Sequence, residues 1–160
     1  MPSILVVCSG NLCRSPLAEA ILRRRLVHQL GDAAPTVRSA GTIAVDGEPV
    51  TPEGELVAAE HGLDTSRHAA TRLEPTLLRG SELVVAMAAE HRAHVAAMDP
   101  VAADRTFTLK ELVRLLEELP PPAGETVEER VAAANERRSG GSHDGDEDVA
   151  DPIGYPIETY

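Results

Sequence analysis

Short apolar runs alternate along this chain with longer stretches of helical periodicity. Residues 3–8 form a continuous apolar run, which is typical of a strand buried on both faces of a parallel sheet. After a polar loop, residues 16–30 repeat leucine at four-residue spacing, with Pro16 suited to a first helical position and Gly31 to a stop. Strand, loop and helix in this order make the first half of a βαβ unit.

The same alternation continues through the rest of the chain. We expect further strands at 36–39, 82–87 and 105–108, and further helices at 52–62, 88–98, 109–119 and 125–138. Three prolines at 120–122 end one helix abruptly, and the acidic stretch near 139–150 predicts an exposed, mobile loop. This order implies a layered α/β domain with a mainly parallel sheet, and we expect residues 1–160 to form one domain.

Composition narrows the class of protein. Aromatic residues make up only 2% of the chain, so the core must be aliphatic, and the formal charge of −11 disfavours binding to nucleic acid or to anionic membranes. No apolar run is long enough to cross a bilayer, and the N-terminus lacks the basic region of a signal peptide. We therefore expect a cytoplasmic protein that does not insert into membranes.

Cysteine and histidine are too few and too dispersed to predict a metal site. Cys8 and Cys13 are the two cysteines of the sequence, which cannot build a disulfide framework or a structural zinc site. His91 and His94 lie three apart on the expected helix 88–98, but no third ligand is near them in the sequence. We interpret them as part of a solvated helix face.

The loop after the first expected strand carries the candidate chemistry. It reads Cys8-Ser9-Gly10-Asn11-Leu12-Cys13-Arg14-Ser15, at the sheet edge where α/β proteins bind ligands. Its backbone N–H groups and the following helix N-terminus can surround a tetrahedral anion, with Gly10 allowing a conformation that a side chain would forbid. Arg14 can clamp two phosphate oxygens, and the same field favours the Cys8 thiolate as a nucleophile. We predict a phosphate site formed by residues 9–15.

A phosphatase also needs an acid that protonates the leaving oxygen. Asp151 is our candidate, because Pro152 biases it toward an extended conformation and stiffens the segment. A carboxyl group on a stiff surface loop could be aimed at a bound phosphate.

These motifs together resemble a known family. The stretch 7–19 closely resembles the signature of the low-molecular-weight protein tyrosine phosphatases of bacterial type. Further matches follow in the family's order, namely Ser39-Ala40-Gly41-Thr42, Glu60-His61-Gly62-Leu63-Asp64 with His68, 82–87, and Asp151-Pro152. In other Cys-x5-Arg phosphatases the acid precedes the cysteine. The resemblance implies a three-layer α/β fold of the phosphotyrosine phosphatase I type, with a central, mainly parallel four-stranded sheet flanked by helices.

The resemblance also implies the catalytic roles. Cys8 would attack phosphorus and form a phosphocysteine, Arg14 would hold the equatorial oxygens, and Asp151 would protonate the leaving group and later activate water. Ser15 would stabilise the thiolate. The implied substrate is a phosphorylated protein, no metal or organic cofactor is expected, and we expect a monomer or weak dimer.

Further residues would support this loop if the resemblance holds. Asn11 would keep the loop's shape through a hydrogen-bond network with Ser39 and His68. Cys13 would protect Cys8 through a reversible disulfide under oxidation.

The chain also departs from the family. Where members often have an aromatic wall around the substrate ring, we expect a wall of Leu12, Ile43 and Tyr155, in which only Tyr155 is aromatic. Members usually continue into a C-terminal helix that packs on the sheet. We expect that helix to be absent here and the stability to be reduced.

Three alternatives to phosphotyrosine hydrolysis stay open. A protein phosphoarginine phosphatase uses the same scaffold, although that branch typically has Thr at the position of Leu12. Thiol-coupled arsenate reduction requires cysteines downstream of Cys13, and the sequence has none. A non-catalytic phosphate-binding module would be expected to have lost Cys8, Arg14 or Asp151, and all three are present.

Overall fold

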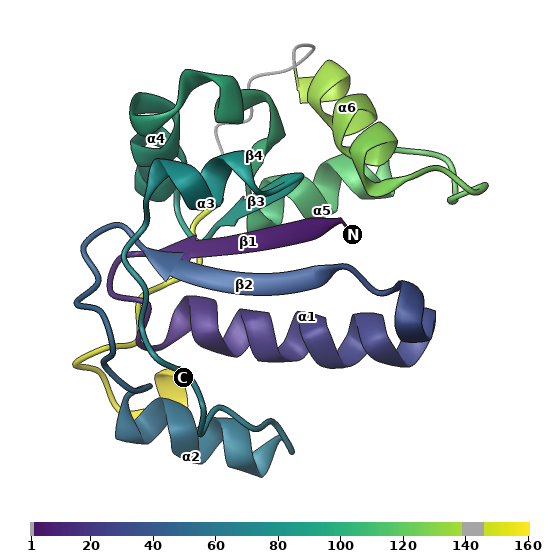
Figure 1. Cartoon of the computed structure of the whole chain (residues 1–160). Helices are drawn as coiled ribbons and strands as arrows, with labels where there is room; N and C mark the ends of the chain where they lie inside the picture. Colours follow the sequence, from purple (N-terminus) through teal and green to yellow (C-terminus); the bar gives the residue numbers. More distant parts are fainter. Residues whose placement is uncertain (1, 139–145) are drawn as a thin grey trace.

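A parallel sheet forms the centre of the molecule. The computed structural model describes residues 2–138 and 146–160. Within these residues, four parallel strands lie in the order β2-β1-β3-β4 (Figure 1). Their bounds are Ser3–Cys8 for β1, Thr36–Gly41 for β2, Leu83–Ala86 for β3 and Thr106–Thr108 for β4. The expected four-stranded parallel sheet is therefore confirmed.

Helices follow the strands as the periodicity predicted. They are α1 (Arg14–Leu30), α2 (Pro52–Glu60), α3 (Pro75–Arg79), α4 (Ala89–Met98), α5 (Leu109–Glu117) and α6 (Val127–Arg138). Short 3-10 turns cover Gly31–Ala33, Pro100–Arg105 and Ile157–Thr159. Neither α3 nor these turns were expected, because elements this short carry too little periodicity to be recognised.

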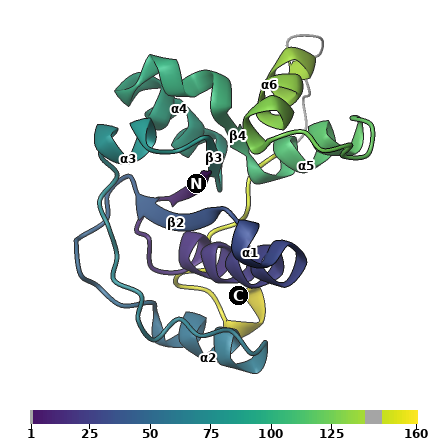
Figure 2. The same cartoon turned by 45° about the vertical axis from the view of Figure 1, so that its right-hand side comes forward.

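Helices cover both faces of the sheet and make the expected third layer (Figures 1 and 2). Successive residues of β1 point to opposite faces, so Ile4 and Val6 join one apolar cluster while Leu5 and Val7 join the other. The first cluster packs against α1, α5 and α6, and the second against α3 and α4. Both clusters are almost wholly aliphatic, with Phe107 the aromatic member.

A buried carboxylate joins three helices beside the sheet. Glu111 forms a capping box at the start of α5, in which its carboxylate accepts the Thr108 N–H while the Thr108 hydroxyl accepts the Glu111 N–H, both at 3.2 Å. The same carboxylate accepts a hydrogen bond from Arg92 of α4 at 2.8 Å and lies 3.0 Å from Nε of Arg138 in α6. Glu111 therefore compensates two guanidinium groups at once.

Replacing Glu111 with glutamine is expected to destabilise the fold by about 3 kcal/mol, because breaking a buried pair leaves uncompensated charge. Urea unfolding followed by circular dichroism measures the change. Glu117→Gln, an exposed carboxylate on the same helix, serves as the control and should change stability by less than ~0.5 kcal/mol. Equal effects of the two substitutions would contradict the structural role of Glu111.

Candidate active site

The sulfur of Cys8 sits among hydrogen-bond donors. Cys8 is the last residue of β1 and is buried. Its Sγ lies 2.9 Å from Ser15 Oγ and accepts the backbone N–H of Asn11 at 3.3 Å. Because the Asn11 side-chain amide donates to Ser15 Oγ at 2.8 Å, the Ser15 proton is free to point at the sulfur. This arrangement stabilises negative charge on Cys8.

The left-handed residue of the loop is Asn11 rather than Gly10. Asn11 has φ 57°, whereas Gly10 lies outside the positive-φ region, and a Cβ on Gly10 would make only ordinary contacts with Leu12 at 3.5 Å. The expectation that Gly10 supplies the special backbone conformation is therefore wrong. Asparagine tolerates this region better than other side chains do, and its own hydrogen bonds hold it there.

Asn11 is the centre of a buried hydrogen-bond network. Its Nδ2 donates to Ser15 and to Ser39, both at 2.8 Å, and its Oδ1 accepts the Thr71 N–H at 2.8 Å. Its backbone carbonyl accepts from Nε2 of His68 at 2.7 Å, so that nitrogen carries the ring proton. The structure thus brings together Asn11, Ser15, Ser39 and His68, the four residues singled out in the sequence as a supporting network.

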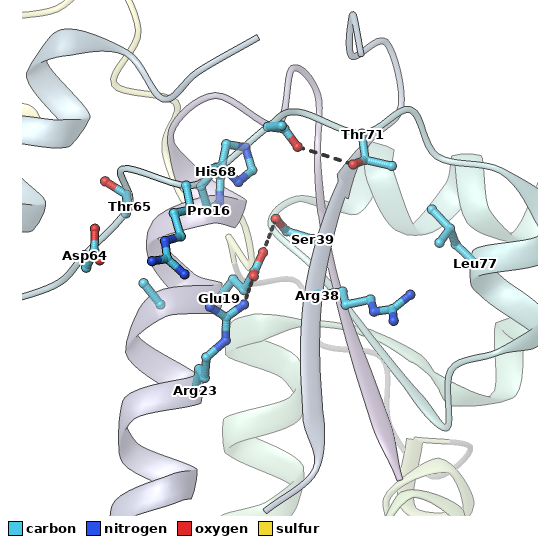
Figure 3. A pocket seen from close by; sticks show the side chains of 13 residues that line it. Pro16, Glu19, Arg23, Arg38, Ser39, Asp64, Thr65, His68, Thr71 and Leu77 are labelled. Atoms are coloured by element: carbon cyan, nitrogen blue, oxygen red, sulfur yellow. Dashed lines mark hydrogen bonds and ion pairs between the residues drawn. The ribbon is translucent and has the colours of Figure 1, made fainter. Parts of the chain in front are cut away.

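Two members of this network were missed in the sequence, Thr71 and Glu19. Ser39 donates to Glu19 at 2.5 Å, and Glu19 also pairs with Arg23 one turn along α1 (Figure 3). These side chains line a cavity of about 350 Å³ between α1, β2 and residues 64–71. Glu19 lies four residues after Ser15 on α1, a spacing that puts both on one helix face and could have revealed it.

Arg14 joins the loop to the candidate acid. Its Nη2 donates to Oδ2 of Asp151 at 2.9 Å and to Ser9 Oγ at 3.4 Å, and its Nη1 donates to the Val149 carbonyl at 3.1 Å. The Arg14 side chain is 7% exposed, whereas that of Asp151 is 45% exposed. The carboxylate can therefore leave the arginine without moving buried groups, and a phosphate would compete with it for the same guanidinium.

The segment that carries Asp151 is anchored. Asp148 accepts the Ala89 N–H at the start of α4 at 2.7 Å, and the Val149 N–H donates to the Met87 carbonyl at 2.7 Å. We expected a mobile loop near 139–150, of which 139–145 lie outside the described residues. These two bonds hold residues 148 and 149 against the residue that follows β3 and against the start of α4, which anchors the chain just before Asp151.

The surroundings of His91 differ from those that the sequence predicted. It is 1% exposed and its Nε2 lies 2.8 Å from Ser9 Oγ, whereas His94 is exposed. Burial, and then the nearby Arg14 guanidinium, lower the pKa of His91 below its usual 6.5. The interpretation of His91 as a solvated residue is therefore wrong. Its place just after β3, which pairs with β1, was the signal that puts it beside the phosphate loop.

The remaining loop and rim residues differ in exposure. Burial, followed by the charges of Asp151 and Cys8, raises the pKa of Cys13 from 9.0 to about 12, so its thiol is neutral at ordinary pH. Both cysteines are free thiols, and their disulfide stays a prediction.

Leu12 is half-buried, while Ile43 and Tyr155 are each 65% exposed. The proposed substrate wall would thus be open to solvent.

Among the residues that the structure describes, no three side chains of His, Cys, Asp or Glu gather in a way that could hold a metal ion. Over the same residues, no helix is both long and apolar enough to cross a bilayer.

Comparisons with known proteins agree on one family. A family model described as low molecular weight phosphotyrosine protein phosphatase matches residues 3–129. The low molecular weight protein-tyrosine-phosphatase Etp of Escherichia coli K12 is 37% identical over 120 residues, covering 75% of this chain and 76% of Etp. The structure of the YwlE arginine phosphatase from Geobacillus stearothermophilus has a TM-score of 0.72 and 31% identity, covering 99% of this chain and 80% of that one. A low molecular weight protein tyrosine phosphatase from T. tengcongensis has a TM-score of 0.65 and 36% identity, covering 88% and 94%.

Proposed function

The chain belongs to the low molecular weight protein-tyrosine-phosphatase family, and on that premise we propose that Cys8, Arg14 and Asp151 together hydrolyse phosphotyrosine in proteins. The observation that carries the proposal is the 2.9 Å contact between Arg14 and Asp151, two residues 137 positions apart, on the loop that begins at Cys8. This contact supports the proposal, because it joins the proposed phosphate clamp and the proposed acid beside the loop that begins with the proposed nucleophile.

In the first step, Cys8 attacks phosphorus and the bond to the leaving oxygen breaks. Ser15 and the Asn11 N–H stabilise the sulfur as an anion before the attack. Arg14 releases Asp151 and binds two oxygens of the phosphoryl group with its fork. Once released by Arg14, the Asp151 carboxylate takes up a proton from solvent, and the resulting carboxylic acid gives that proton to the leaving tyrosine oxygen.

In the second step, the phosphocysteine is hydrolysed. The Asp151 carboxylate takes a proton from a water molecule, whose oxygen attacks phosphorus. Cys8 departs as a thiolate with the electron pair of the S–P bond, and inorganic phosphate leaves the loop. Asp151 ends this step protonated. All of these steps use side chains of this chain, and the proposal requires no cofactor.

Phosphoarginine is the second candidate substrate. The observation that favours it is the YwlE arginine phosphatase, whose structure aligns with 99% of this chain at a TM-score of 0.72, against 88% and 0.65 for the tyrosine phosphatase from T. tengcongensis. Leu12 argues the other way. A phosphoarginine guanidinium brings N–H donors that need acceptors, and the half-buried Leu12 side chain offers none, whereas it suits the face of an aromatic ring.

Wild type is expected to cleave a phosphotyrosine peptide with a kcat/KM about 10-fold above that for a phosphoarginine peptide of the same sequence. Leu12→Thr, which adds a hydroxyl acceptor, should narrow this ratio. Val27→Thr, the same kind of change at an exposed site far along α1, is the control and should leave the ratio unchanged. A wild-type preference for phosphoarginine would establish the second candidate in place of the first.

The net charge and the family also support proposals about the partners of this protein. We propose phosphorylated proteins as partners, because the family acts on phosphoproteins, and no role for nucleic acid, because the formal charge is −11. A cytoplasmic location, one catalytic domain over residues 1–160, and a monomer or weak dimer complete the proposal.

A further inference from the structure

One nitrogen of the buried His91 imidazole has a hydrogen-bond partner, and the other has none among the residues that the structure describes. His91 is the third residue of α4, and its Nε2 lies 2.8 Å from Ser9 Oγ and 3.4 Å from Oε1 of the exposed Glu90. Its Nδ1 is buried without a hydrogen-bond partner among the described residues. Burying the unpaired Nδ1 costs free energy. A functional role for the hydrogen bond of Nε2 would explain why a histidine occupies this position.

The protonation state of His91 follows from its surroundings. Burial and the Arg14 guanidinium lower its pKa, opposed by the carboxylates of Glu90, Asp148 and Asp151. The ring is therefore neutral at ordinary pH and carries one proton. A lone pair on Nε2 would face the Glu90 carboxylate, so the proton is favoured on Nε2, from which it is donated to Ser9 Oγ.

Ser9 passes this constraint to Arg14. Its hydroxyl oxygen accepts from His91 and, at 3.4 Å, from Nη2 of Arg14. Two donors occupy both lone pairs and stop the hydroxyl from rotating. When phosphate displaces Asp151, the Arg14 guanidinium keeps its hydrogen bonds to Ser9 Oγ and to the Val149 carbonyl, and these two bonds set the orientation of its plane. The direction of the fork then depends on a fixed Ser9.

We propose that His91 is a positioning residue that orients Arg14 for phosphate binding, acting through the Ser9 hydroxyl. The proposal rests on the phosphatase function given above. In this proposal α4 does more than pack against the sheet, because its residue His91 fixes the orientation of the Ser9 hydroxyl in the phosphate loop.

The test uses a pair of substitutions at His91 and a matched control. His91→Leu keeps apolar volume but removes the donor, and kcat/KM for para-nitrophenyl phosphate should fall about 10-fold, with the affinity for inorganic phosphate measured by calorimetry falling in parallel. His91→Gln can place an amide N–H near the same spot and should recover most of both quantities. His94→Leu, on the exposed face of the same helix, should leave both unchanged.

Thermal unfolding separates positioning from mere structure. The His91→Leu variant should melt no lower than wild type, because the unpaired Nδ1 is removed with the ring. The proposal would be overturned if His91→Leu had the same kcat/KM and the same phosphate affinity as wild type. It would also be overturned if His91→Leu lost kcat/KM and phosphate affinity together with a lower melting temperature, and His91→Gln did not restore them. If wild type binds phosphate without turnover, the proposed function fails, while a weaker phosphate affinity in His91→Leu would still support positioning.

Discussion

Replacing Cys8 with serine is expected to reduce the turnover of para-nitrophenyl phosphate by about 10⁴-fold or more. The contacts of the sulfur explain why. Both of its hydrogen-bond partners, Ser15 Oγ and the Asn11 N–H, are placed to stabilise an anion, and neither can remove a proton. A serine hydroxyl at this position would keep its proton at neutral pH and would be a poor nucleophile.

Phosphate binding provides the control for this prediction. The Arg14 fork and the loop N–H groups are unchanged in Cys8→Ser, so calorimetry should still show binding of inorganic phosphate. Turnover is measured near pH 6 without added metal, and circular dichroism checks the fold. If the variant keeps more than about a tenth of the wild-type rate, Cys8 is not the nucleophile.

Replacing Asp151 with asparagine is expected to lower kcat by about 10²–10⁴-fold for phenyl phosphate, whose leaving group needs a proton. The loss should be smaller for para-nitrophenyl phosphate, because nitrophenolate leaves without full protonation. The 2.9 Å ion pair adds a second consequence. Asparagine competes more weakly for the Arg14 guanidinium, so inorganic phosphate should bind more tightly to the variant than to wild type.

In Asp151→Asn, kcat should fall while the affinity for inorganic phosphate should rise. This combination distinguishes a catalytic acid from a surface carboxylate without a catalytic role. Glu158→Gln removes the same charge from an exposed position on the same C-terminal segment and should leave kcat and phosphate affinity unchanged. A loss in Asp151→Asn that is equal for both leaving groups would contradict the acid role. Unchanged phosphate affinity would show that the ion pair does not compete with the substrate.

The parts predicted well from the sequence are those fixed by local patterns. The run at 3–8 and the leucines of 16–30 give β1 and α1, because burial on a sheet and on a helix face each imposes its own spacing. The position of the phosphate loop follows from these two predictions, because the loop joins the end of β1 to the start of α1. The sequence offered Asp151 as the acid, from its place before Pro152 and from the family resemblance, but no spacing rule predicts its contact with Arg14, because the two residues are 137 positions apart.

The parts missed depend on contacts between segments. His91 and His94 show the same helical spacing in the sequence, and only the packing of α4 against the loop buries one and exposes the other. Gly10 was the residue with the freest backbone, yet the hydrogen bonds of the Asn11 side chain put the left-handed conformation one residue later. Helix α3, five residues long, is shorter than the windows in which periodicity can be read.

Both tyrosines of the chain, Tyr155 and Tyr160, follow Asp151, and the sequence contains no tryptophan. Intrinsic fluorescence therefore arises from the segment that carries the acid and is silent about the sheet. An unlabelled sample thus holds a built-in optical probe of how that segment responds when phosphate takes Arg14 from Asp151. Stopped-flow emission would time that exchange separately from the bond-breaking steps.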